Sequence, residues 1–278
     1  MPRAPEPDPP GIPELDAGLI GSESPRPGVT YRLFRVLFRV VASVLRFHAE
    51  VSGLEALPRT SDGRLAGGWI AAGLPHRIWI DPFLLWLVLP VEPRLVFFGD
   101  ARTMARSPLR RWVVRRIGGI LPIPSHGGPK AFATHIAAAG EVLRAGAVFC
   151  LFPEYGGPAP VGESRPVAAG LGYIALRTGG PIVPIVIGGN HELFLGRRIV
   201  VRVLAPLDPR ALAGISSDSA APDVPAPAPG SAQERAAAHA LADAFRASTA
   251  AAVAAAHAAA EPPAGTRKRG LRMTTLFR

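Results

Sequence analysis

Short apolar runs typical of buried strands alternate with helical segments between residues 51 and 208, and this pattern constrains the fold most. The strand-like runs are rich in β-branched and aromatic residues and lie at 69–72, 95–98, 148–152, 182–187 and 199–204. Helical segments are predicted between them at 82–89, 108–117, 130–145 and 167–178. Alternation of this kind places helices on the faces of a sheet. We therefore expect an α/β fold whose central sheet is mostly parallel or mixed and is flanked by helices.

The segments outside this α/β domain, assigned to residues 51–210, differ from it in composition. Residues 1–30 hold many prolines, which interrupt helices and sheets, so a disordered tail is expected there. Residues 211–230 have the composition of a Pro/Ala linker, and residues 231–260 are predicted to form an alanine-rich helix. Ser231 and Glu234 form a capping box at its start, and residues 261–278 are expected to be a basic tail.

Residues 31–50 are predicted to form an amphipathic helix that associates with a membrane. Four arginines, Arg32, Arg35, Arg39 and Arg46, fall within about 60° of one another on a helix, and the rest of its surface is apolar. Such a helix suits the headgroup region, with its arginines reaching lipid phosphates. The alternative is a core helix with one solvent-exposed edge.

No apolar run is long enough to cross a bilayer, since the best candidate, residues 82–91, has only ten residues. The proline-rich start does not have the basic and apolar regions of a secretion signal. We therefore expect a peripheral protein on the cytoplasmic face of the cell membrane.

The charge balance predicts an anionic partner. Thirty-one Lys and Arg against 21 Asp and Glu give a net charge of +10, which suits a membrane surface, nucleic acid or an acidic carrier protein. Residues 106–116 carry five arginines, but on a helix these surround the axis, which argues against reading a nucleic-acid groove. An anionic membrane surface is therefore the expected partner, and nucleic acid is not.

Several kinds of site are not expected. Cys150 is the only cysteine, which excludes an internal disulfide and any site of several thiolates, and its apolar neighbours favour a buried position. His126, His135 and His191 do not share a helical spacing, so no metal site is predicted. Glycine-rich nucleotide loops of the GxxxxGK[ST] type are absent from the sequence, and no cofactor is expected.

The most informative stretch joins a strand, a turn and a helix around His76 and Asp81. Pro82 fits the first position of a helix and Asp81 its N-cap, where helix-end amides keep a carboxylate ionised. If the loop folds back, Asp81 accepts one ring N–H of His76 and leaves the other nitrogen free to take a proton. The stretch therefore predicts a general-base dyad.

This stretch resembles the first motif of the glycerolipid acyltransferase family, His-x4-Asp. Gly119 to Ile123 is similar to the second motif of that family, Phe152, Pro153 and Glu154 to the start of the third, and residues 182–185 to the fourth. The resemblance implies transfer of a fatty acyl group from acyl-CoA or acyl carrier protein to a lysophospholipid or other lipid-like hydroxyl or amine, with no covalent acyl-enzyme. It implies that His76 is the base, that Asp81 orients it, and that Glu154 with its two neighbours binds the acceptor.

Two departures from the family pattern concern the acceptor. Tyr155, Gly156 and Gly157 stand where Gly-Thr-Arg usually follows, and Ser125 stands where the second motif usually ends in arginine. Since guanidinium groups suit a phosphomonoester, Arg77, Lys130 and Arg165 are candidates to replace them. The altered third motif leaves a second hypothesis, a catalytically inactive lipid-binding module.

Overall fold

The computed structural model describes residues 26–78, 80–100, 119–123, 129–157, 159–215, 228–266 and 268. Within these residues a seven-stranded sheet forms the centre of the molecule. From edge to edge its strands are β1 (His48–Ser52), β7 (Arg198–Val203), β6 (Ile182–Gly188), β2 (Ile70–Leu74), β5 (Val148–Leu151), β3 (Leu95–Asp100) and β4 (Ile120–Ile123). Neighbouring strands are parallel except β6 and β7, so the predicted mostly parallel or mixed sheet is confirmed.

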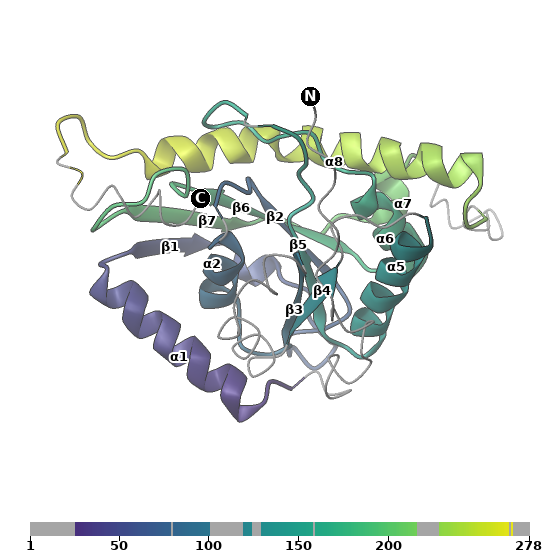
Figure 1. Cartoon of the computed structure of the whole chain (residues 1–278), viewed down its shortest axis with the longest axis horizontal. Helices are drawn as coiled ribbons and strands as arrows, with labels where there is room; N and C mark the ends of the chain where they lie inside the picture. The colour runs from purple at the N-terminus through teal and green to yellow at the C-terminus, as the bar shows by residue number, and fades with distance from the viewer. Residues whose placement is uncertain are drawn as a thin grey trace, which may run out of the picture.

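Helices cover both faces of the sheet (Figure 1). One face packs against α5 (Pro129–Arg144), α6 (Gly170–Thr178) and α8 (Ala232–Ala260), and the short α7 (Pro209–Leu212) lies beside α6 and α8. The other face packs against α1 (Val29–Val44) and α2 (Asp81–Val88), and the 3-10 turn η2 (Leu54–Ala56) follows β1. The chain therefore adopts the predicted α/β arrangement, a central sheet flanked by helices.

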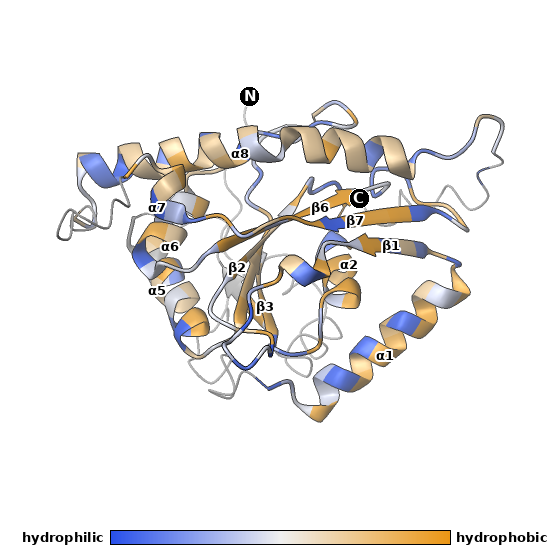
Figure 2. Cartoon of the chain, turned by 180° about the vertical axis from the view of Figure 1, so that it is seen from behind, coloured by the Kyte–Doolittle hydropathy of each residue, from blue (hydrophilic) through white to orange (hydrophobic). Residues whose placement is uncertain are grey.

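The central strands are apolar on both sides because both sides are covered. In β2, Ile70 and Ala72 face the core under α5, α6 and α8, whereas Ala71 belongs to the core under α1 and α2. Every residue of β2 and β6 is buried. In Figure 2, β6 is coloured mostly orange, for hydrophobic residues. Near-continuous apolar runs are typical of parallel strands with helices on both faces.

Helix α1 differs from its prediction in extent and orientation. It ends at Val44, and residues 48–50, which were assigned to the helix, belong to β1. Its inner face packs on α2, where Tyr31 meets Trp86 edge-on at 5.0 Å and Phe38 stacks on Phe83 at 4.8 Å between ring centroids. Its outer face is apolar and exposed, and consists of Val29, Leu33, Val36, Leu37, Val40, Val41 and Val44.

The prediction that Arg35 reaches lipid phosphates with the other arginines of α1 is wrong, because Arg35 is only 3% exposed. Its guanidinium donates to the carbonyl oxygens of Leu87 and Leu89, which end α2 and have no helical partner. Burial, followed by the charge of Arg39, lowers the pKa of Arg35 to about 10, so it stays charged at neutral pH. Arg35 therefore fixes α1 to α2 and does not face a headgroup.

The other three arginines of the stripe are exposed. Arg32 forms an ion pair with Glu92, and Arg46 lies beyond the helix with a positive φ of 55°. Among the helices that the structure describes, none combines the length and the apolar character needed to cross a bilayer. The arginine-rich segment 106–116, most of the proline-rich tail and most of the basic tail lie outside the described residues.

Candidate active site

His76 and Asp81 lie at the carboxyl ends of three central strands that are neighbours and run parallel. β2 ends at Leu74 just before His76, β5 ends at Leu151 before Glu154, and β6 ends at Gly188 before Asn190. Because these strands are parallel, their carboxyl ends bring residues that are far apart in sequence to one place. Ligands of open α/β sheets bind outside the carboxyl ends of the strands.

The loop after β2 folds back onto the start of α2, as the sequence predicted. His76 Nδ1 lies 3.0 Å from Asp81 Oδ2. Asp81 is the first residue of the helix, with Ile80 at the N-cap, so its predicted N-cap position is wrong by one residue because the backbone of Ile80 is already helical. The carboxylate instead accepts the N–H groups of Arg77 at 2.7 Å and Ile78 at 2.9 Å.

The Asp81 side chain is fully buried and each oxygen has a donor. Oδ2 receives the three contacts from the loop, and Oδ1 accepts a hydrogen bond of 3.0 Å from Asn190 Nδ2. A buried carboxylate is costly unless it is hydrogen-bonded, and here four N–H donors surround it. Because Asp81 Oδ2 accepts a hydrogen bond from the ring, His76 carries its proton on Nδ1 and leaves Nε2 as the acceptor.

The imidazole of His76 is held on one side and open on another. Its ring lies 4.6 Å from the Phe152 ring, tilted by 31°. The side chain remains 36% exposed, and within the described residues no hydrogen bond reaches Nε2. The ring can therefore receive a proton from a group that approaches from outside the protein.

Glu154 holds the backbone of the same loop. Its Oε2 accepts the N–H of His76 at 2.7 Å, and its Oε1 accepts the N–H of Arg165 at 2.8 Å. The Glu154 side chain is fully buried, and the neighbouring Pro153 is buried too. As placed, Glu154 positions the loop of the base, and its predicted contact with an acceptor stays a prediction.

The arginines predicted to bind a phosphate make bonds to backbone carbonyls. Arg77 donates to Ala159 and Pro160, both at 2.7 Å, and to Glu163 at 2.5 Å. Arg165 donates to the carbonyl of His76 and, at 3.3 Å, to that of Gly156. Both side chains therefore brace the loops around the dyad in this structure. Lys130 lies in the first turn of α5, and its side chain, like the whole of Ser125, lies outside the described residues.

Asn190 is the member of this site that sequence reasoning missed. It is 2% exposed and its Nδ2 donates to Asp81 Oδ1 and, at 2.9 Å, to the carbonyl of Pro75. The available signal was its position two residues after the strand β6, since a polar residue at the carboxyl end of a parallel strand often serves a site. Asn190 thus ties the carboxylate to the loop that carries the base.

Comparisons with known proteins identify a family and a similar fold. The family model described as Acyltransferase matches residues 48–188, which include His76, Asp81 and Glu154. Among solved structures, the 1-acyl-sn-glycerophosphate (LPA) acyltransferase PlsC from Thermotoga maritima has a similar fold, with a TM-score of 0.51 and 21% sequence identity. The match covers 68% of this chain and 71% of that protein. The comparison with curated proteins gave no match.

Proposed function

The chain belongs to the acyltransferase family, and on this premise we propose that it moves a fatty acyl group from acyl-CoA or acyl carrier protein to a lipid-like hydroxyl or amine. The observation that carries the proposal is the dyad, in which a buried, fully hydrogen-bonded Asp81 orients an imidazole that is open at Nε2. A general base with this geometry activates a hydroxyl or amine nucleophile.

The proposed reaction has no covalent acyl-enzyme. His76 Nε2 removes the acceptor proton as the acceptor atom attacks the thioester carbonyl carbon, and the Asp81 carboxylate stabilises the imidazolium that forms. The tetrahedral intermediate then collapses, the carbon–sulfur bond breaks, and the thiolate takes the proton from the imidazolium. Proton transfer by a positioned base contributes roughly 100- to 10,000-fold to the rate.

The acceptor is proposed to be a lysophospholipid or another lipid with one free hydroxyl or amine. The Thermotoga maritima protein is named for 1-acyl-sn-glycerophosphate, but in this chain Arg77 and Arg165 make bonds to loop carbonyls. A phosphate would therefore have to compete with these bonds. The donor is proposed to be acidic, as CoA and carrier protein both are, because the chain has a net charge of +10.

The enzyme is proposed to work as a peripheral protein on the cytoplasmic face of the membrane, with α1 as the contact. The exposed valines and leucines of α1 form one continuous face, and Arg39 is exposed beside it. Figure 2 shows this helix as mostly hydrophobic with polar interruptions. In this arrangement the apolar face enters the acyl boundary and the exposed arginines meet the headgroups.

The α1 contact is tested by replacing Leu37 and Val40 together with Gln, which keeps helix propensity and removes apolar area. We expect binding to vesicles that contain anionic lipid to fall at least about 10-fold in co-sedimentation. The control is Val161→Gln, an exposed valine outside α1, which leaves binding unchanged. Equal binding by the double variant and the native chain would contradict a membrane role for α1.

The activity is tested by giving the purified protein isotope-labelled acyl-CoA, or acyl carrier protein, together with a membrane lipid extract. Mass spectrometry should find one labelled lipid class that appears together with release of free thiol. That product identifies both donor and acceptor. Vesicle binding with neither thiol release nor labelled lipid would favour the catalytically inactive lipid-binding module instead.

A further inference from the structure

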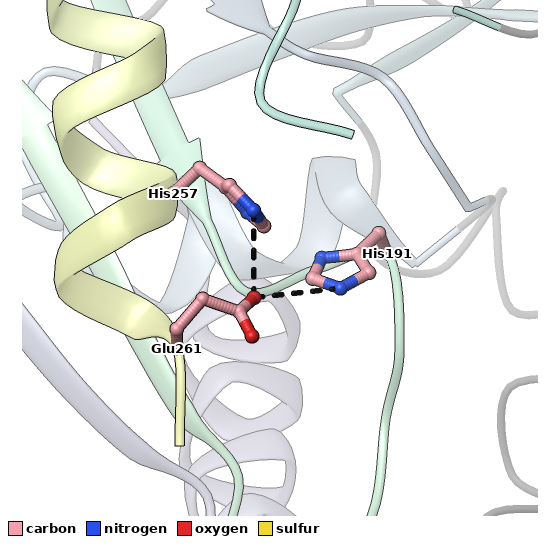
Figure 3. A group of neighbouring side chains, drawn as sticks. All are labelled: His191, His257 and Glu261. Carbon is pink, nitrogen blue, oxygen red and sulfur yellow. Dashed lines mark ion pairs between the residues drawn. The ribbon is translucent and has the colours of Figure 1, made fainter. Parts of the chain in front are cut away.

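Three side chains with metal-ligating atoms meet beside the segment that carries Asn190, and none of the three belongs to the dyad. His191 lies in the segment after β6, and His257 and Glu261 lie one helical turn apart at the end of α8 (Figure 3). Both imidazoles point toward the Glu261 carboxylate from different sides, with Nε2 of His191 3.7 Å and Nε2 of His257 3.5 Å from its Oε1. One ligand atom from each residue lies within 4.8 Å of the other two.

Close backbone packing fixes the position of this group. The end of α8 lies against the end of β6, where a Cβ at Gly188 would come within 2.1 Å of the carbonyl oxygen of Ala256. Only glycine permits that approach, because the oxygen belongs to a rigid helix backbone. His257, the next residue of α8, is thereby held opposite His191.

We propose that His191, His257 and Glu261 bind one divalent transition-metal ion of the zinc type. Two imidazoles and one carboxylate are a ligand set that Zn²⁺ accepts, with a water molecule in the fourth position. In a tetrahedral zinc site neighbouring ligand atoms lie roughly 3.4 Å apart, and the two distances to Glu261 are already close to that value. The Glu261 side chain is 46% exposed, which leaves room for the water.

The charges around the group set how tightly the ion is held. Arg197 Nη2 lies 3.6 Å from Glu261 Oε1, so a dication meets a fixed positive charge nearby. The Arg197 guanidinium is itself anchored, since its Nε donates to the carbonyl of Gly189 at 3.0 Å. The site is therefore expected to hold a metal more weakly than a closed structural zinc site.

A bound ion would join the end of α8 to the segment that carries Asn190. Asn190 precedes His191 and donates to Asp81 Oδ1. The metal would therefore stabilise the support of the catalytic carboxylate, although it takes no part in proton transfer. This role is independent of which acyl donor or acceptor the enzyme uses.

The test uses the untagged full chain after treatment with a chelator. Co²⁺ added to it should bind with one-to-one stoichiometry and give the intense visible absorption of a four-coordinate ion, and Zn²⁺ should displace it. Zn²⁺ at about 100 times its dissociation constant should raise the melting temperature by roughly 5 °C. His257→Gln and Glu261→Gln should each lose the absorption and the shift.

The matched control is His239→Gln, because His239 is an exposed histidine on the same helix and lies outside the group. It should bind Co²⁺ as the native chain does. Absence of saturable binding, or binding that is equal in His257→Gln and the native chain, would overturn the proposal. Acyl transfer by the metal-free enzyme is a separate measurement, so failure of the metal site would leave the catalytic proposal intact.

Discussion

The dyad depends on hydrogen-bond donors that reach both oxygens of the Asp81 carboxylate. Backbone N–H groups of Arg77 and Ile78 and the amide of Asn190 hold it in place, so it can orient His76 without moving. Glu154 fixes the loop from the other side through the N–H of His76. Preorganisation of this kind means that proton transfer needs little rearrangement of the protein.

Asn190→Ala removes one of these supports and tests the assignment of Asn190 as a positioning residue. The variant leaves Asp81 Oδ1 and the carbonyl of Pro75 without that donor, so the carboxylate can shift away from His76. We expect kcat of acyl transfer to fall about 10-fold or more, with KM values unchanged, because the contact acts on the base and not on substrate.

The control for Asn190→Ala is Ser231→Ala, which removes the cap of α8 and costs about 1 kcal/mol of stability far from the dyad. It should leave kcat unchanged when both variants are measured well below their melting temperatures. A loss of kcat that is equal in the two variants would show that Asn190 acts only through stability.

At the level of helices and strands, some features could be predicted from the sequence and others could not. The dyad was predictable because His76 and Asp81 are only five residues apart, within one continuous strand–loop–helix segment. Asn190 was not, since its place beside Asp81 depends on β6 pairing with β2, which the sequence does not encode locally. The arginine periodicity located α1 but could not tell that Arg35 faces the carbonyl ends of α2.

The predicted capping box of α8 forms in part, because Ser231 caps Glu234 as expected, whereas Glu234 reaches the N–H of Gly230 in place of that of Ser231. Ser231 Oγ accepts the N–H of Glu234 at 3.0 Å, and Glu234 accepts the N–H of Gly230 at 2.6 Å. Arg177 of α6 also donates to both oxygens of Glu234, at 2.6 and 2.9 Å. These bonds, the Arg177 bond above all, lower the pKa of Glu234 below its ordinary value of 4.5.

Glu234→Gln should therefore destabilise the protein in a pH-dependent way. Because the pKa is lowered in the folded state, the stabilisation is complete above pH 4.5 and is lost as the pH falls below it. At pH 7 the free energy of unfolding should fall by about 2 kcal/mol, and the difference should shrink in acid. Urea unfolding at pH 7 and pH 4 measures both.

Glu50→Gln is the control for this measurement, since Glu50 pairs with Arg198 at an exposed site. Its effect should stay within about 0.5 kcal/mol at both pH values. A Glu234→Gln effect that is equally small would contradict a stabilising link between α6 and α8.

At the scale of the whole molecule, α8 closes one face of the sheet although it has few large side chains. Its larger buried side chains, besides Glu234, are Leu241, Phe245, Thr249 and Val253, and its other buried residues are alanines. Its contact with α6 requires Gly172, where a Cβ would lie 2.4 Å from the carbonyl oxygen of Ala238. Close approach of backbones thus replaces the apolar bulk that the sequence of this helix does not provide.

Gly172→Ala and Gly140→Ala should have opposite effects on stability. Both glycines lie inside helices, where alanine is favoured by up to about 1 kcal/mol. At Gly140 the nearest atom to a new Cβ is Thr178 Cγ2 at 3.6 Å, an ordinary contact, so Gly140→Ala should stabilise. Gly172→Ala should destabilise by about 1–3 kcal/mol, since α8 must move away. Thermal unfolding that ranks the two variants the other way would contradict the packing of α8 on α6.

If the imidazole of His76 is the base, its removal in His76→Ala must slow the release of thiol from the acyl donor. With the acyl donor and acceptor identified in the lipid survey, we expect this rate to fall at least about 100-fold while the melting temperature and vesicle binding stay unchanged. His239→Ala, on the exposed side of α8, should keep the native rate. Turnover by His76→Ala within about twofold of the native enzyme would contradict the account.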